Sequence, residues 1–75
     1  MTQLANISGK QAIRSFCKIG YEIVRQKGSH ARLRHPESLS HRSLTVPLHR
    51  ELKIGLLHQL IKDAGLTAEE FLSNL

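Results

Sequence analysis

The segment around Gly28-Ser29 constrains the fold of this chain most strongly. Residues 21–27 before it are rich in strand-favouring side chains, and a second strand-like segment follows over 30–35 until Pro36 ends it. A glycine at the first of two turn positions is typical of a type II′ turn, which joins neighbouring antiparallel strands directly. The sequence therefore predicts a β-hairpin, on which any helices have to pack.

A helical pattern precedes the hairpin. Ser8 and Gln11 have the spacing of a capping box, and Gly20 is placed to end the helix that they open. The apolar stripe of this helix comprises Ala12, Ile13, Phe16 and Cys17. We therefore expect Cys17 in the core as a small apolar residue, since no neighbour in the sequence would activate it as a nucleophile.

A third strand and a second helix follow the polar loop 36–42. Residues 43–46 alternate as a short strand, which Pro47 ends. The second helix is expected to begin within 52–56 and to end at Ala64. Its predicted apolar stripe comprises Leu56, Leu57, Leu60, Ile61 and Ala64.

A short last helix completes the predicted order, because Thr67 and Glu70 form another capping box ahead of Phe71, Leu72 and Leu75. The predicted order is a helix, three antiparallel strands, a second helix and a short last helix. This order indicates an α+β fold in which the helices cover one face of the sheet and the other face is in solvent. We expect one domain over 1–75, because this length is enough for one domain and no more. So small a domain favours chemistry on an open face over an enclosed pocket.

The two-residue turn also predicts the pairing of the hairpin. Lys27 lies opposite His30, Gln26 opposite Ala31, Arg25 opposite Arg32, Val24 opposite Leu33 and Ile23 opposite Arg34. Because side chains alternate between faces, Val24, Ala31 and Leu33 then face the helices. The open face carries Arg25, Lys27, His30, Arg32 and Arg34. A one-residue bulge would reverse these faces.

The open face predicted in this way is densely cationic. Like charges directly opposite each other destabilise a sheet by up to about 1 kcal/mol. A bound polyanion offsets that repulsion, so we favour anion binding over a merely solvated face. The whole chain is basic as well, with 11 Lys and Arg against 6 Asp and Glu, for a net charge of +5. Nucleic acid, an acidic protein and an acidic membrane surface all fit that charge.

Other features narrow the partner and the compartment. No apolar run reaches the ~18–20 residues of a transmembrane helix, and the first residues lack the pattern of a signal peptide. The single cysteine excludes an internal disulfide, so we expect the cytoplasm. Phe16 and Phe71 are assigned to the core, which leaves no aromatic platform for stacking bases. Recognition of RNA is then expected to rely on the backbone and shape more than on base stacking.

Among five histidines, His30 has the most distinctive position, directly after the turn and beside Lys27 and Arg32 on the predicted open face. Histidine suits general acid–base work on a ribose 2′-hydroxyl or a phosphate. His35 is expected to face the helices, and His58 to lie on the polar side of the second helix. His41 and His49 are expected near the sheet edge, with no role assigned.

Metal and cofactor motifs are missing from the sequence. It contains no H-E-x-x-H, no C-x-x-C and no glycine-rich phosphate loop, and no acid is placed to orient His30 in a triad. We therefore predict no cofactor and no metal.

An ordered set of short motifs runs through nearly the whole chain: Ser8-Gly9-Lys10, Gly20-Tyr21, Val24-Arg25-Gln26-Lys27-Gly28-Ser29-His30, Arg34-His35-Pro36, Thr45-Val46-Pro47, Glu51-Leu52-Lys53 with Gly55, Ala64-Gly65-Leu66 and Glu69-Glu70-Phe71-Leu72. In this order the chain resembles the HicA toxins of toxin–antitoxin pairs. Gly-Ser-His alone is a short motif, whereas the ordered set is specific.

The resemblance implies a fold like that of double-stranded-RNA-binding domains and a metal-independent ribonuclease that cleaves mRNA and arrests growth. The catalytic histidine would be His30, and the natural inhibitor a HicB-type antitoxin that covers the active face. Arg25, Lys27, Ser29, Arg32 and Arg34 would bind the RNA. Arg32 departs from the family, since typical members carry an aliphatic residue there, and it adds charge to the open face.

Two other functions remain open at this point. One is a non-catalytic RNA-binding module of the same fold. The other is a protein-interaction domain whose basic face binds only an acidic partner.

Overall fold

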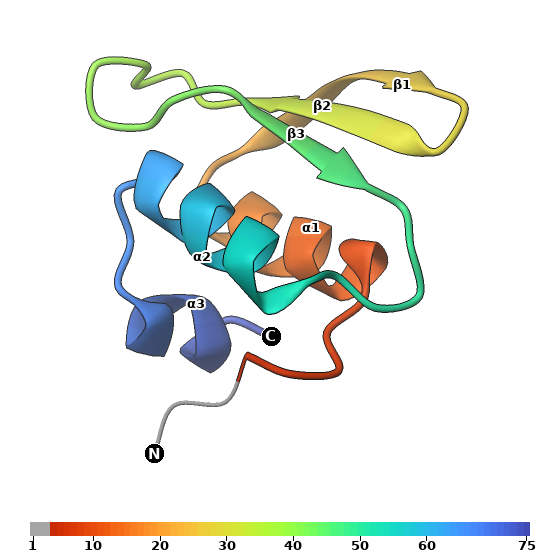
Figure 1. Ribbon diagram of the computed structural model, residues 1–75. Coiled ribbons are helices and arrows are strands. Elements are labelled where there is room, and N and C mark those ends of the chain that lie inside the picture. Colours follow the sequence, from red (N-terminus) through yellow and green to blue (C-terminus); the bar gives the residue numbers. More distant parts are fainter. Residues whose placement is uncertain (1–3) are drawn as a thin grey trace.

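The computed structural model describes residues 4–75, and its elements follow the predicted order (Figure 1). The helices are α1 (Gly9–Lys18), α2 (Ile54–Asp63) and α3 (Ala68–Ser73), and the strands are β1 (Glu22–Lys27), β2 (His30–Arg34) and β3 (Leu44–Pro47). The strands form one antiparallel sheet in the order β1-β2-β3, with the helices on one side of it (Figure 1). The predicted α+β fold is confirmed.

Local sequence signals set the ends of two helices. The Oγ atom of Ser8 accepts from the Gln11 backbone N–H at 3.1 Å, while the Gln11 side chain accepts from the Ser8 N–H at 2.8 Å. Thr67 and Glu70 form the same reciprocal pair at the start of α3. Both predicted capping boxes are confirmed. The backbone after α1 takes a φ of +111° at Gly20, the left-handed conformation expected there.

The third strand extends one residue beyond its predicted end. It spans Leu44–Pro47 instead of 43–46, so Pro47 lies inside the strand and pairs with His30. Because β3 is an edge strand, a residue without an N–H is tolerated there. The sheet therefore continues to the level of the hairpin turn.

The core lies between the sheet and the helices, where α1 and α3 are joined by a buried hydrogen bond. Ser15 is fully buried, and its hydroxyl donates to the Phe71 carbonyl at 2.7 Å. The rings of Phe16 and Phe71 lie beside it, with centroids 5.1 Å apart. The prediction that Cys17 belongs to the core is wrong, because Ser15 takes an inward position and Cys17 is exposed. Partial desolvation raises the pKa of the Cys17 thiol, which keeps it protonated at neutral pH.

The apolar stripe of α2 is narrower than predicted. Leu57, Leu60, Ile61 and Ala64 are buried. Leu56, assigned to the same stripe, is exposed instead, because α2 packs on β3 and α3 with a single side. Leu75 at the end of the chain is also exposed.

The hairpin pairing is correct near the turn and wrong at its far end. Lys27 pairs with His30, Gln26 with Ala31 and Arg25 with Arg32, as predicted. Beyond Arg25, however, a bulge shifts the register, so Ile23 pairs with Leu33 and Glu22 with Arg34. The predicted pairs Val24–Leu33 and Ile23–Arg34 do not form.

The bulge overturns the assignment of Val24 to the helix-facing core. Val24 is 55% exposed and Ile23 is 51% exposed. The physical reason is the position of the helices: α1 and α2 pack on β3, at the other edge of the sheet, and all six residues of β1 are exposed. Burial therefore does not select the register at this end of the hairpin.

A cluster of rings holds the loop between β2 and β3 against the helical side. His35 is buried as expected, and its Nε2 lies 2.8 Å from the Ile19 carbonyl while its Nδ1 accepts from the Glu37 N–H at 3.0 Å. His41 stacks on His35 and places its Nδ1 2.6 Å from the Ala64 carbonyl. The Tyr21 ring packs on both histidines. Both histidines are therefore structural.

The phenol of Tyr21 makes the stability of the fold sensitive to pH in the alkaline range. Its hydroxyl donates to the Arg42 carbonyl at 2.6 Å, and burial, followed by the negative charge of Asp63, raises the pKa of Tyr21 to about 12. An unfolded tyrosine ionises near pH ~10. Between about pH 10 and 12 the unfolded chain has lost this proton and the folded chain has kept it, so the free energy of unfolding falls as the pH rises.

Tyrosinate absorbance tests this directly, because the chain contains one tyrosine. The folded protein should titrate near pH 12, and the urea-unfolded protein near pH ~10. A midpoint near ~10 in the folded protein would contradict the burial argument.

Candidate functional site

The open side of the sheet carries the residues singled out from the sequence. On β2 the side chains alternate, with Ala31 and Leu33 buried against the helices and His30, Arg32 and Arg34 exposed on the other side. The pairs Lys27–His30 and Arg25–Arg32 place two β1 cations on that same side. We call this set, Arg25, Lys27, His30, Arg32 and Arg34, the cationic face. The bulge does not disturb the cationic face, because the bulge lies on the side of Arg25 that is away from the turn.

His30 occupies a well-anchored position at the start of β2. It is flanked by Lys27 on β1 and by Pro47 on β3. Gly28 in the preceding turn has a φ of +57°, as the first position of a type II′ turn requires. The Leu48 N–H donates to the Ser29 carbonyl at 2.6 Å, which fastens the turn to the loop after β3. The His30 side chain is exposed, and no hydrogen bond within residues 4–75 engages its ring.

Charges on the cationic face are poorly balanced by the protein itself. Arg25 and Arg32 lie directly opposite each other, and the Arg32 guanidinium donates to a neutral partner, the Thr45 hydroxyl, at 2.9 Å. Glu22, opposite Arg34, is the one acidic residue among the three strands. An anion in front of the sheet would therefore meet a surplus of cations.

Glu22 and Thr45 are the residues of this face that the sequence did not identify. The predicted register placed Ile23 opposite Arg34, and the bulge brings Glu22 there instead. Thr45 could have been identified, because it alternates with the apolar Leu44 and Val46 in the expected strand 43–46 and therefore faces away from the core.

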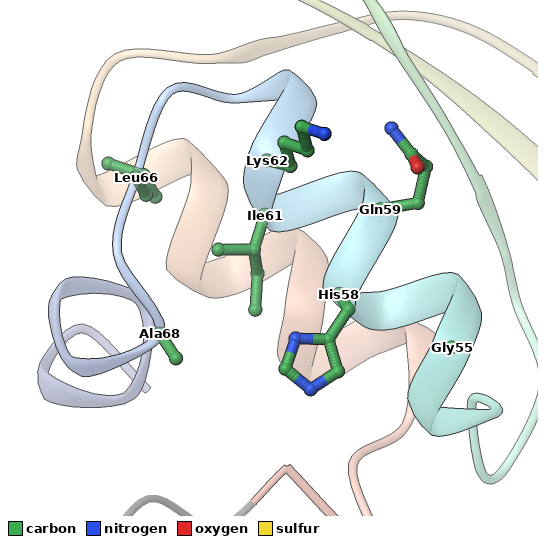
Figure 2. A pocket seen from close by; sticks show the side chains of 7 residues that line it. All are labelled: Gly55, His58, Gln59, Ile61, Lys62, Leu66 and Ala68. Carbon is green, nitrogen blue, oxygen red and sulfur yellow. The ribbon is translucent and has the colours of Figure 1, made fainter.

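None of the remaining histidines belongs to the cationic face. His58 is exposed on α2, as predicted, and lines a hollow of about 390 Å³ in the helical layer. Figure 2 shows its ring pointing away from α2 in this hollow, with Ile61 and Lys62 on the neighbouring turn. His49 is exposed in the loop that follows β3. Only His30 therefore combines exposure with a place among the strand cations.

The arrangement suits chemistry on a bound polyanion. An exposed imidazole can transfer protons, while neighbouring guanidinium and ammonium groups stabilise negative charge that develops on a phosphate. Within residues 4–75, no three His, Cys, Asp or Glu side chains gather as a group that could hold a metal ion. None of the helices in that range is long and apolar enough to cross a membrane.

The chain matches a known protein family over most of its length. A family model described as the HicA toxin of bacterial toxin–antitoxin systems matches residues 9–66, a stretch that includes α1, the whole sheet and α2. A comparison with curated protein sequences gave no match.

Proposed function

Because this chain belongs to the HicA family of bacterial toxins from toxin–antitoxin systems, we propose that it is an endoribonuclease that cleaves mRNA and so blocks translation. The observation that supports this proposal is the place of His30, exposed at the start of β2 and surrounded by strand cations. In this proposal the cationic face binds the RNA and His30 performs the chemistry.

The proposed reaction is a transesterification within the RNA strand. His30 removes the proton from a ribose 2′-hydroxyl, whose oxygen then attacks the adjacent phosphorus. The 5′-oxygen of the next nucleotide leaves and receives a proton, from the protonated His30 ring or from water. The products are a strand that ends in a 2′,3′-cyclic phosphate and a strand with a free 5′-hydroxyl.

The other proposed site residues act on the backbone of the RNA. Arg25, Lys27, Arg32 and Arg34 bind phosphates, and those nearest His30 stabilise the negative charge of the pentacovalent phosphorus. The hydroxyl of Ser29, in the turn beside His30, donates to a phosphate oxygen. Reactivity then depends on the backbone and the 2′-hydroxyl more than on base identity.

Inhibition follows from the openness of the face. We propose that a HicB-type antitoxin presents an acidic surface to the cationic face and covers His30. The toxin is then inactive because RNA and antitoxin compete for the same cations. The proposal involves no cofactor and no membrane, and places both proteins with mRNA in the cytoplasm.

RNA cleavage in the presence of a chelator tests the metal-independent reaction. The purified protein should cleave unmodified RNA at the same rate with and without EDTA, because His30 supplies the proton transfers and the strand cations supply the charge stabilisation. Denaturing gels measure the rate, and the 2′,3′-cyclic ends identify the reaction.

Three other results would contradict this proposal in different ways. Loss of cleavage in EDTA that Mg²⁺ restores would indicate a metal-dependent nuclease. Binding without cleavage would indicate a non-catalytic RNA-binding module. No measurable RNA affinity at low salt, where phosphate contacts are strongest, would indicate a protein-interaction domain.

A further inference from the structure

A second group of cations lies outside the cationic face, on α1. Lys10, Arg14 and Lys18 are all exposed, and their spacing of four residues places them on one side of the helix. We call these three residues the α1 stripe. The helix contains no acidic residue, so no carboxylate of α1 itself pairs with them.

Repulsion within the α1 stripe opposes the helix when no anion is bound. Cations four residues apart repel each other, and Lys10 in the first turn opposes the helix dipole, whereas Lys18 in the last turn interacts favourably with it. Successive members of the stripe are about 6 Å apart along the helix axis. That separation is close to the distance between successive phosphates of a nucleic-acid strand, so one extended strand can contact all three.

The end of the α1 stripe is connected to the region around His30. A hollow of about 430 Å³ beside the start of α1 is lined by Ser8, Lys10, Leu48, His49 and Arg50. The Gly9 N–H donates to the His49 carbonyl at 2.9 Å, and the Leu48 N–H donates to the Ser29 carbonyl at 2.6 Å. Two backbone hydrogen bonds thus join the hairpin turn, this basic hollow and α1 into one surface.

We propose that the α1 stripe, together with His49 and Arg50, is a second RNA-binding region. It holds the backbone phosphates of nucleotides that flank the one placed at His30, after the strand has passed around the hairpin end of the sheet. This inference rests on the proposed RNA-directed function and extends it: the bound RNA is longer than the sheet alone can contact.

Two variants of equal charge test the position of the cations. The first replaces the α1 stripe: Lys10→Gln, Arg14→Gln and Lys18→Gln. The control replaces three exposed cations elsewhere: Arg42→Gln, Lys53→Gln and Lys62→Gln. Each lowers the net charge from +5 to +2, since 11 cations become 8 against 6 acids. Thermal unfolding of both variants establishes that they are folded.

Affinity is measured by fluorescence anisotropy with 2′-O-methyl RNA, which keeps the phosphates but cannot be cleaved through its 2′-oxygen. With an oligonucleotide of about 16 nucleotides, the stripe variant should bind roughly tenfold more weakly than the control. The slope of log affinity against log salt should fall by about 2, from the loss of three phosphate contacts. About 4 nucleotides are too short to span the cationic face and the α1 stripe together, so with this RNA the difference between the two variants should shrink well below tenfold.

Equal affinity of the two variants for the longer RNA would overturn the proposal. So would a stripe variant that keeps its RNA affinity and loses only its affinity for the antitoxin, because the stripe would then be a protein contact. Cleavage of unmodified RNA by the wild-type protein separates the two proposals. If RNA binding depends on the α1 stripe but no RNA is cleaved, the proposed nuclease activity is refuted and the second RNA-binding region is supported. If RNA is cleaved but binding does not depend on the α1 stripe, the nuclease activity is supported and the second RNA-binding region is refuted.

Discussion

Replacing His30 by alanine is expected to abolish RNA cleavage and growth arrest while the protein stays folded. General acid–base catalysis by a positioned side chain contributes about 10²–10⁴-fold to a rate, and in the proposed reaction His30 removes the proton from the attacking 2′-hydroxyl. The side chain is exposed and makes no hydrogen bond within residues 4–75. Its removal should therefore change the free energy of unfolding by no more than about 0.5 kcal/mol.

His58→Ala is the matched control, since it removes an exposed histidine from the helical layer. It should leave cleavage unchanged. The His30→Ala protein should also keep its affinity for 2′-O-methyl RNA, because the strand cations remain. Cleavage rates on gels, growth after induction and anisotropy distinguish these effects. A His30→Ala protein that cleaves RNA at the wild-type rate would refute the assignment.

Adding one methyl group should have opposite effects on stability at two glycines in first turns of helices. A Cβ at Gly9 would lie 2.0 Å from the Pro47 carbonyl oxygen and 3.0 Å from the Leu48 Cα, both backbone atoms that cannot rotate away. A Cβ at Gly55 would meet nothing within 4 Å. Gly9→Ala is therefore expected to cost about 1–3 kcal/mol. Gly55→Ala should gain about 0.4–1 kcal/mol, because it restricts the unfolded chain.

Thermal unfolding followed by circular dichroism measures this difference. Each 1 kcal/mol shifts Tm by about 4–8 °C in a domain of this size, so the Tm values of the two variants should differ by roughly 6–30 °C. Equal Tm values would contradict the close approach of α1 to the end of β3. Because the same approach fixes the loop beside Ser29, Gly9→Ala should also weaken cleavage at temperatures where the protein remains folded.

Features that depend on neighbouring residues in the sequence were predictable. The Ser8–Gln11 capping box and the turn at Gly28 involve residues at most three apart, and both formed as expected. Distant contacts were not predictable. Ser15 displaces Cys17 from the core because its hydroxyl bonds to Phe71, 56 residues away. No local sequence pattern predicts the hydrogen bond between Ser15 and Phe71.

The positions of the candidate site residues could be predicted where they depend on local strand pairing. They could not be predicted where they depend on the packing of the whole fold. Strand alternation and a two-residue turn are sufficient to place Arg25, Lys27, His30 and Arg32 on one side of the sheet. The bulge at Val24 depends instead on where the helical layer stops beneath β1, which is a property of the whole fold. The position of Glu22 opposite Arg34 therefore had no signal in the sequence.

The two outer strands also bear on how the protein behaves when it is concentrated. An unpaired strand edge is a template on which other chains can add and aggregate. In β1 the bulge at Val24 interrupts the regular spacing of the free N–H and carbonyl groups, and Arg25 and Lys27 repel a second copy. On β3, Pro47 offers no N–H at all. Both borders of the sheet are thus interrupted, which disfavours the addition of a second copy along either edge although Ile23 and Val24 are exposed.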